Sequence, residues 1–221
     1  MITLVPVAAL VIAQARPAVA SVESRLQNSI DVLDSFMDDP QQRIPERILR
    51  RAKGIAIIPG VTSAGFIFGG TRGAGILTLK QESGQWSNPA FVTLTGGSVG
   101  LQIGARTTDL ILLFMNERSV RAALNRSFDL GGDVGVAAGP VGGNVVTPTD
   151  ASGSDVLAYS RSAGLFAGVS LGGTKLAFDQ DSSAQFYNQE DLTPQKILLD
   201  PSLSSPPLVA SMRRSLNQAM K

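Results

Sequence analysis

The 221-residue sequence contains no cysteine and no histidine. The absence of cysteine excludes disulfide bonds, thiol nucleophiles and a lipid-modified cysteine anchor. Together the two absences remove the usual zinc ligands and the commonest general base. Enzymes can work with carboxylates or with a Ser-Lys pair instead, but the sequence favours a protein that is not an enzyme and that uses no metal or cofactor.

Neither sign of charge predominates in the sequence, and long hydrophobic runs are scarce. The chain has 19 basic and 18 acidic residues, so no net field steers it toward nucleic acid. The apolar run at residues 4–13 is too short for a transmembrane helix. Because the small-x-small sequence Ala18-Val19-Ala20 follows it, we predict a signal peptide over residues 1–20 and a single domain over residues 21–221. The protein would then be exported, to the periplasm or outside the cell.

Glycine, in contrast, is abundant, with 23 residues placed mostly on alternate positions. Gly65, Gly69, Gly73 and Gly75 share one parity while apolar residues occupy the other, which predicts strands with one nearly bare face. Such a face allows either strong sheet curvature, in a small barrel or tight sandwich, or a groove where a ligand lies against backbone. We favour curvature. A groove would be lined by Gly69, Gly73 and Asp133, which shares the glycine side. The pattern recurs at residues 99–104, 131–139 and 164–172.

Helices are predicted at both ends of this β-rich middle. Val22 to Met37 has apolar residues at three- and four-residue spacing after Ser21, a residue type that caps helices. Its apolar stripe includes Leu26, Ile30 and Leu33, and burial at about 1.5–3 kcal/mol per side chain favours a helix docked on the core. Further helices are predicted at 45–53, 117–124 and 206–220, with a turn at residues 59–60 and a last hairpin at 155–178. The expected fold is therefore α+β, with a curved antiparallel sheet flanked by terminal helices.

The second predicted helix carries the one concentrated basic patch. Arg47, Arg50 and Arg51 fall on one side of a helical wheel, and Lys53 lies at its border. These cations could be a solvated face placed favourably at a helix C-terminus. Alternatively they form a surface that faces anions.

Ten short motifs occur in a fixed order along the chain: Ile44-Pro45, AKGIAIIP at 52–59, the glycine-rich run at 65–75, Trp86-Ser87-Asn88-Pro89, GLQIG at 100–104, Asp109, AGPVG at 138–142, Tyr159-Ser160, GLFAG at 164–168 and Phe186-Tyr187. This set resembles the SYLF domain over about residues 25 to 200. The resemblance implies a lipid-binding module, because eukaryotic members bind phosphoinositides. Yeast relatives also bind and bundle actin, usually beside a Src-homology-3 domain.

In that family, lipid binding is attributed to an amphipathic and basic N-terminal segment. By position this segment corresponds here to the helix with Leu26, Ile30 and Leu33, and to the basic set Arg47, Arg50, Arg51 and Lys53. The expected partner is an anionic phospholipid surface. Actin is not expected, since an exported protein would not meet it. The alternative is a non-catalytic envelope scaffold or interaction domain. A stable homo-oligomer that does not bind vesicles would indicate this alternative.

Overall fold

The computed structural model describes residues 21–40, 43–65, 68–99, 104–141, 153–162, 165–166 and 171–221. The predicted signal peptide therefore lies outside the described residues. The helices are α1 (Val22–Asp38), α2 (Glu46–Arg51), α3 (Glu117–Ala123), α5 (Gln180–Tyr187), α6 (Pro194–Leu199) and α7 (Pro207–Ala219). The strands are β1 (Gly54–Gly65), β2 (Phe68–Leu79), β3 (Ala90–Val99), β4 (Gly104–Phe114), β5 (Ser127–Leu130), β6 (Val136–Ala138), β7 (Val156–Ser162), β8 (Leu165–Phe166) and β9 (Thr174–Phe178).

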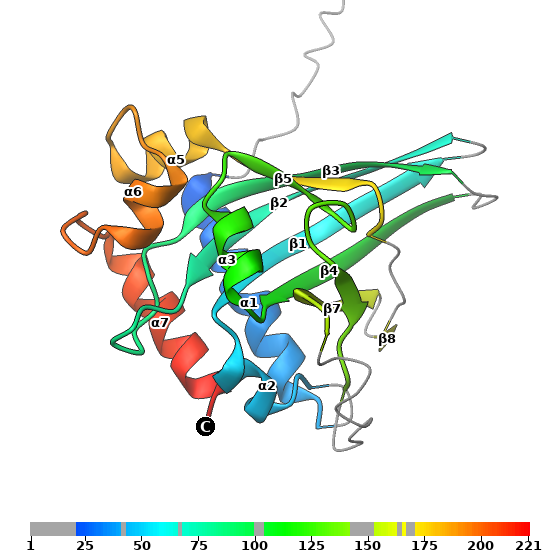
Figure 1. Cartoon of the computed structure of the whole chain (residues 1–221), viewed down its shortest axis with the longest axis horizontal. Helices are drawn as coiled ribbons and strands as arrows, with labels where there is room; N and C mark the ends of the chain where they lie inside the picture. Colours follow the sequence, from blue (N-terminus) through cyan, green and yellow to red (C-terminus); the bar gives the residue numbers. More distant parts are fainter. Residues whose placement is uncertain are drawn as a thin grey trace, which may run out of the picture.

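The strands form one nine-stranded sheet in the order β5-β9-β3-β2-β1-β4-β7-β6, with β8 paired to β7. Every pairing is antiparallel except that of β6 with β7. The predicted α+β fold with a curved antiparallel sheet is thus confirmed, in the form of a curled half-barrel. Figure 1 shows the helices gathered around one end of the sheet, while β1 to β4 extend beyond them as long ribbons. The last hairpin predicted at 155–178 is confirmed only at its start, where β7 pairs antiparallel with β8. β9 does not continue it, because β9 pairs with β3 and β5, while the other edge of β7 pairs with β4 and β6.

Alternation along the strands divides the apolar side chains between two cores. One core contains residues from central strands, such as Leu77 and Leu112, together with Phe128 and Leu130 of the terminal strand β5. Strands far apart in the sheet order meet in this core because the sheet curls around it. The other face lies under α1 and α7. Its core is formed by Ile55, Ile57, Ile76, Phe91, Ile111 and Leu113 from the strands, with apolar residues of the two helices.

A bulge in β1 produces part of the curvature. Residues 59–60 were expected to end a strand as a turn, but β1 runs through them, and the register shifts there against both neighbouring strands. Proline is tolerated at such a site because a bulged residue needs no ladder hydrogen bond. Gly60 adopts a left-handed φ of 59°, and its N–H donates to Asp109 Oδ1 at 2.9 Å. The predicted turn is therefore corrected to a bulge within one strand.

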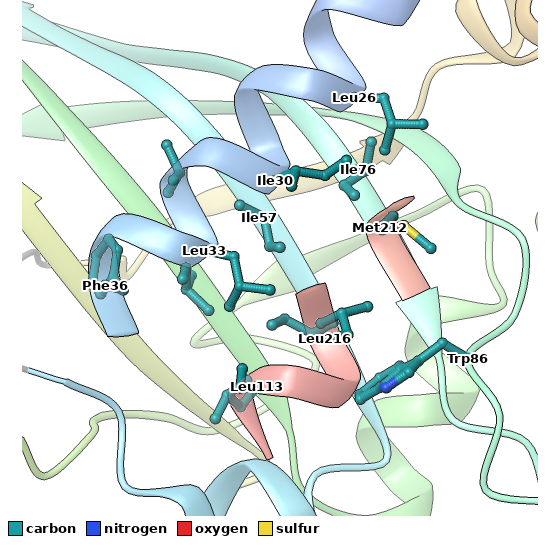
Figure 2. Close-up of a cluster of buried hydrophobic side chains, with 14 of the residues drawn as sticks. Leu26, Ile30, Leu33, Phe36, Ile57, Ile76, Trp86, Leu113, Met212 and Leu216 are labelled. Carbon is teal, nitrogen blue, oxygen red and sulfur yellow. The ribbon is translucent and has the colours of Figure 1, made fainter. Parts of the chain in front are cut away.

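The first helix is docked on the sheet, as its apolar stripe predicted. Ser21 caps α1 by accepting a hydrogen bond from the Ser24 N–H. Leu26, Ile30 and Leu33 are 0%, 6% and 1% exposed, respectively. Figure 2 shows these three side chains pointing from α1 toward the sheet, with Met212 and Leu216 of α7 beside them. The stripe that the sequence assigned to lipid contact is thus part of the core.

Polar contacts fasten α1 at both ends. Near its start, Arg25 donates to Asp179 Oδ2 at 2.8 Å, and both side chains are largely buried. Asp179 also caps α5, because it accepts hydrogen bonds from the N–H and the hydroxyl of Ser182. Near the other end, Arg161 donates to the Ser35 carbonyl at 2.6 Å. These contacts link α1 to α5 and to β7.

We predict that Asp179 makes folding stability sensitive to acid. Burial alone would raise the pKa of Asp179, but hydrogen bonds from Arg25 and Ser182, with the charge of Arg25, hold it below the ordinary value of 3.8. The stabilisation is therefore complete well above pH 3.8 and is lost as the pH falls through the lower folded pKa. Asp179→Asn is expected to cost about 1–3 kcal/mol at pH 7 and to flatten the acid limb of a plot of unfolding free energy against pH. Asp31→Asn, on the exposed side of α1, is the control; an unchanged acid limb in Asp179→Asn would contradict the prediction.

Candidate functional site

The basic patch of the sequence lies on α2 and on the residue pair that follows it. Pro45 precedes the helix, and Leu49 and Ala52 are buried, so the intervening arginines point outward. Arg50 Nη1 lies 3.7 Å from a carboxylate oxygen of Glu46, one helical turn before it. Lys53 forms an ion pair with Glu117 at the start of α3. The four sequence-predicted cations, Arg47, Arg50, Arg51 and Lys53, are all exposed.

Three of these cations line a cleft of about 850 Å³, which we call the basic cleft. Its walls come from the C-terminal end of α2, the end of β2 with the turn that follows, the end of α6, and α7. The basic residues lining it are Arg50, Arg51, Lys53, Lys80 and Arg213, and the acidic ones are Glu82, Glu117 and Asp200. Because Glu117 is already paired with Lys53, the remaining charge in the cleft is positive.

Sequence reasoning missed Lys80 and Arg213, which both interact with Trp86. Lys80 Nζ lies 5.9 Å from the centre of the Trp86 ring and donates to the Arg50 carbonyl at 3.1 Å. Arg213 Nε donates to the Trp86 carbonyl at 2.8 Å, and its Nη2 donates to Asn88 Oδ1 at 3.0 Å. Trp86 and Asn88 belong to one of the sequence motifs, so this motif holds a distant arginine in place. No local pattern marks Lys80, a single cation directly after the end of β2.

Arg47 lies on another side of α2 and does not line the cleft. Burial raises the pKa of Tyr159 in β7, and the positive charge of Arg47 offsets part of this increase. The four cations predicted from the sequence therefore lie on two different surfaces. Arg50, Arg51 and Lys53 face the cleft, whereas Arg47 extends the positive surface toward β7.

Two of the three residues of the predicted groove, Gly73 and Asp133, have close neighbours in the structure. A side chain at Gly73 would come within 2.8 Å of Ile58 and 2.9 Å of Val61, so its bare side is filled by the bulged strand β1. Asp133 lies in the tight turn after β5, where its Oδ2 accepts a hydrogen bond from the Asp129 N–H at 2.9 Å. The side-chain surroundings of Gly69 lie outside the described residues. At Gly73 the absence of a side chain thus serves close strand packing.

Two further features bear on the kind of site. In the part of the chain that the structure describes, no three carboxylates come close enough together to hold a metal ion. None of the described helices has both the length and the apolar character needed to cross a bilayer.

The chain is similar in sequence to proteins of one family. Residues 95–219 match the family model Ysc84, described as "Las17-binding protein actin regulator". The chain is 35% identical over 209 residues to Protein YSC84 of Saccharomyces cerevisiae, covering 90% of this chain and 44% of that protein. It is 32% identical over 189 residues to SH3 domain-containing YSC84-like protein 1 of Xenopus laevis, covering 82% and 56%, and 33% identical over 184 residues to the Homo sapiens protein of that name, covering 79% and 53%. The chain thus spans about half the length of these relatives.

Proposed function

This chain belongs to the Ysc84 family, the SYLF domain family, and we propose that it binds anionic phospholipid membranes peripherally through the basic cleft and the adjoining surface of α2. The observation that carries the proposal is the gathering of five basic side chains in one cleft against three acidic ones. Two of these cations, Lys80 directly after β2 and Arg213 on α7, are far from α2 in the sequence. The fold therefore concentrates positive charge on one surface of a chain whose net charge is only +1.

The outward face of α1 supports this choice of surface. Its exposed residues include Glu23, Asp31 and Asp38, and the only basic residue of the helix, Arg25, is paired with Asp179. An anionic membrane would repel that face. Since the apolar face of α1 is also buried, the helix as folded offers no surface for membrane insertion. The α2 side of the molecule is the favourable approach.

The expected affinity is that of a reversible attachment. Each cation near an anionic bilayer contributes about 1 kcal/mol, so the four that have no carboxylate partner among the described residues, Arg47, Arg51, Lys80 and Arg213, together provide about 4 kcal/mol, or near a thousandfold in partition. This contribution falls at high ionic strength because salt screens exposed charges. Membrane binding by this mechanism should therefore be salt-sensitive.

We predict that reversing three charges, Arg47→Glu, Arg51→Glu and Lys53→Glu, lowers partition onto anionic vesicles by at least about a hundredfold. The loss of about 1 kcal/mol of attraction at each of the unpaired Arg47 and Arg51 gives about thirtyfold, and the repulsion from three new carboxylates raises the effect to that factor. Co-sedimentation with phosphatidylglycerol vesicles, with phosphatidylcholine vesicles as the neutral reference, measures it at low and high salt. Arg50 is kept because it donates to the Met220 carbonyl and helps to hold the C-terminal segment.

The matched control variant reverses three exposed or half-exposed cations that do not line the cleft, Arg72, Arg126 and Lys175. It changes net charge by the same amount and should retain most of the binding. Equal losses in the two variants would show that only net charge matters, and the proposed surface would be wrong. If the wild-type protein fails to bind any vesicle, the scaffold alternative takes precedence, and sedimentation equilibrium would then be expected to show a homo-oligomer.

An actin-linked role is the second candidate, because the matching family model is described as an actin regulator. Export directed by residues 1–20 is also part of our proposal, and it separates the two candidates, since an exported protein would not meet actin. Cell fractionation of the full chain and actin co-sedimentation of residues 21–221 test them together. Retention of the protein in the cell with saturable actin binding would favour the second candidate.

A further inference from the structure

Three cations of the basic cleft, Arg51, Lys80 and Arg213, have no carboxylate partner in the described part of the chain. Lys53 is neutralised by Glu117, and Arg50 lies near Glu46. Lys80 and Arg213, in contrast, contact only uncharged groups: backbone carbonyls, an amide oxygen, a thioether sulfur and the Trp86 ring. Their positive charges are therefore available to an external anion.

The geometry around Trp86 holds these two cations in place before any ligand arrives. Arg213 makes two hydrogen bonds at 2.8 and 3.0 Å, one to Trp86 and one to Asn88, which fix its guanidinium group. Lys80 is held between the Arg50 carbonyl, the Met220 sulfur and the ring of Trp86. Side chains that are already ordered lose little conformational entropy when they bind an anion.

An apolar residue stands at the same cleft. Leu199, at the end of α6, lines the cleft and is 48% exposed, the one large apolar side chain that is exposed among the described residues. A cationic interior beside an exposed leucine matches a membrane interface, where an apolar side chain enters the bilayer and cations meet phosphate groups. A soluble anion without an apolar group would gain no binding energy from contact with Leu199.

We propose that the basic cleft binds the phosphate group of a single lipid headgroup between Lys80 and Arg213, while Leu199 enters the membrane interface beside it. This inference rests on the proposed membrane function and adds to it a defined, saturable site. It predicts a preference for lipids whose phosphate is accessible as a monoester, since a doubly charged phosphate accepts more hydrogen bonds from two cations than a diester does. Glu82 and Asp200 line the cleft as well, so the site suits one phosphate group better than a dense polyanion.

Trp86 provides the experimental signal, because it is the only tryptophan of the chain and its ring contacts Lys80. The full chain would be titrated with short-chain dihexanoyl phosphatidic acid, with glycerol 3-phosphate, and with an acidic peptide that contains leucine, while Trp86 fluorescence is followed. Calorimetry would give the stoichiometry. We expect one phosphatidic acid per chain and weaker binding of glycerol 3-phosphate.

Substitutions at Lys80 and Leu199 separate the contribution of the cation to phosphate binding from that of the leucine to lipid binding. Lys80→Gln should weaken both phosphate ligands about tenfold, and Lys80→Arg should restore the binding. Leu199→Ser should weaken the lipid alone, and the exposed Lys175→Gln is the matched control that should change nothing. Circular dichroism confirms that each variant is folded.

Several results would overturn the inference. They are equal behaviour of Lys80→Gln and Lys175→Gln, equal affinity for glycerol 3-phosphate and the lipid, and binding of the acidic peptide in preference to both phosphates. The two proposals fail in different ways. Salt-sensitive vesicle binding that is insensitive to Lys80→Gln would leave the membrane function standing without this site, whereas absence of vesicle binding by the wild-type protein would remove the membrane function itself.

Discussion

Replacing Leu26 and Ile30 together by alanine is expected to lower the free energy of unfolding by about 4–10 kcal/mol, an amount comparable with the whole stability of a typical domain. Each side chain is almost completely buried between α1, the sheet and α7. Large-to-alanine changes at such positions cost about 2–5 kcal/mol each, and a domain has only about 5–15 kcal/mol to lose. Because the two side chains share one helix face, the combined loss can differ from the sum of the single losses.

Urea unfolding followed by circular dichroism measures this effect, with Gln27→Ala and Asn28→Ala on the exposed face of the same helix as the control. The result also decides how α1 takes part in membrane binding. An unfolded double variant would mean that the apolar stripe is needed inside the protein. A stable double variant that no longer binds vesicles would instead show that these residues act on the lipid, and our placement of the binding surface at the cleft would need revision.

Local signals explain why α1 could be predicted so well. Its apolar spacing, its cap at Ser21 and its end before Pro40 all lie within one stretch of sequence, and the structure confirms the helix within one residue. The basic patch on α2 was visible for the same reason. Lys80 and Arg213, in contrast, are separated by more than a hundred residues and meet only because the turn after β2 packs against α7. A cleft built from distant elements leaves no local pattern.

Two errors show where a local pattern is ambiguous. Proline followed by glycine marks both turns and bulges, and only the register of the neighbouring strands decides between them. Similarly, the last hairpin was expected to continue to Phe178, but only its short β7–β8 part forms and β9 does not belong to it. In the structure β7 and β9 lie toward opposite ends of the sheet order. Neither strand carries a local signal that names its partner, so proximity along the chain was a poor guide.

The glycines on alternate positions left two explanations open, and Gly75 separates them most clearly. An added Cβ at Gly75 would lie 2.0 Å from the Ile57 carbonyl oxygen and 2.8 Å from the Ile58 Cα. Both are backbone atoms of β1 at the bulge, so no side-chain rotation can relieve the clash. A strand position with this contact can hold only glycine while β1 and β2 keep their present distance.

Gly75→Ala is therefore expected to destabilise the protein by about 3–5 kcal/mol or to prevent folding, which is severe for the addition of one methyl group. Gly97→Ala is the matched control, because it lies in β3 with no atom within 4 Å of the added Cβ and should change stability by less than about 0.5 kcal/mol. Thermal and urea unfolding of the two variants measure the difference. Equal stability would mean that β1 can move away from β2 at low cost, and the bulge would then not require glycine. A large difference would establish that the bare face of β2 is needed for curvature, which in turn brings the ends of α2, β2 and α7 together around the basic cleft.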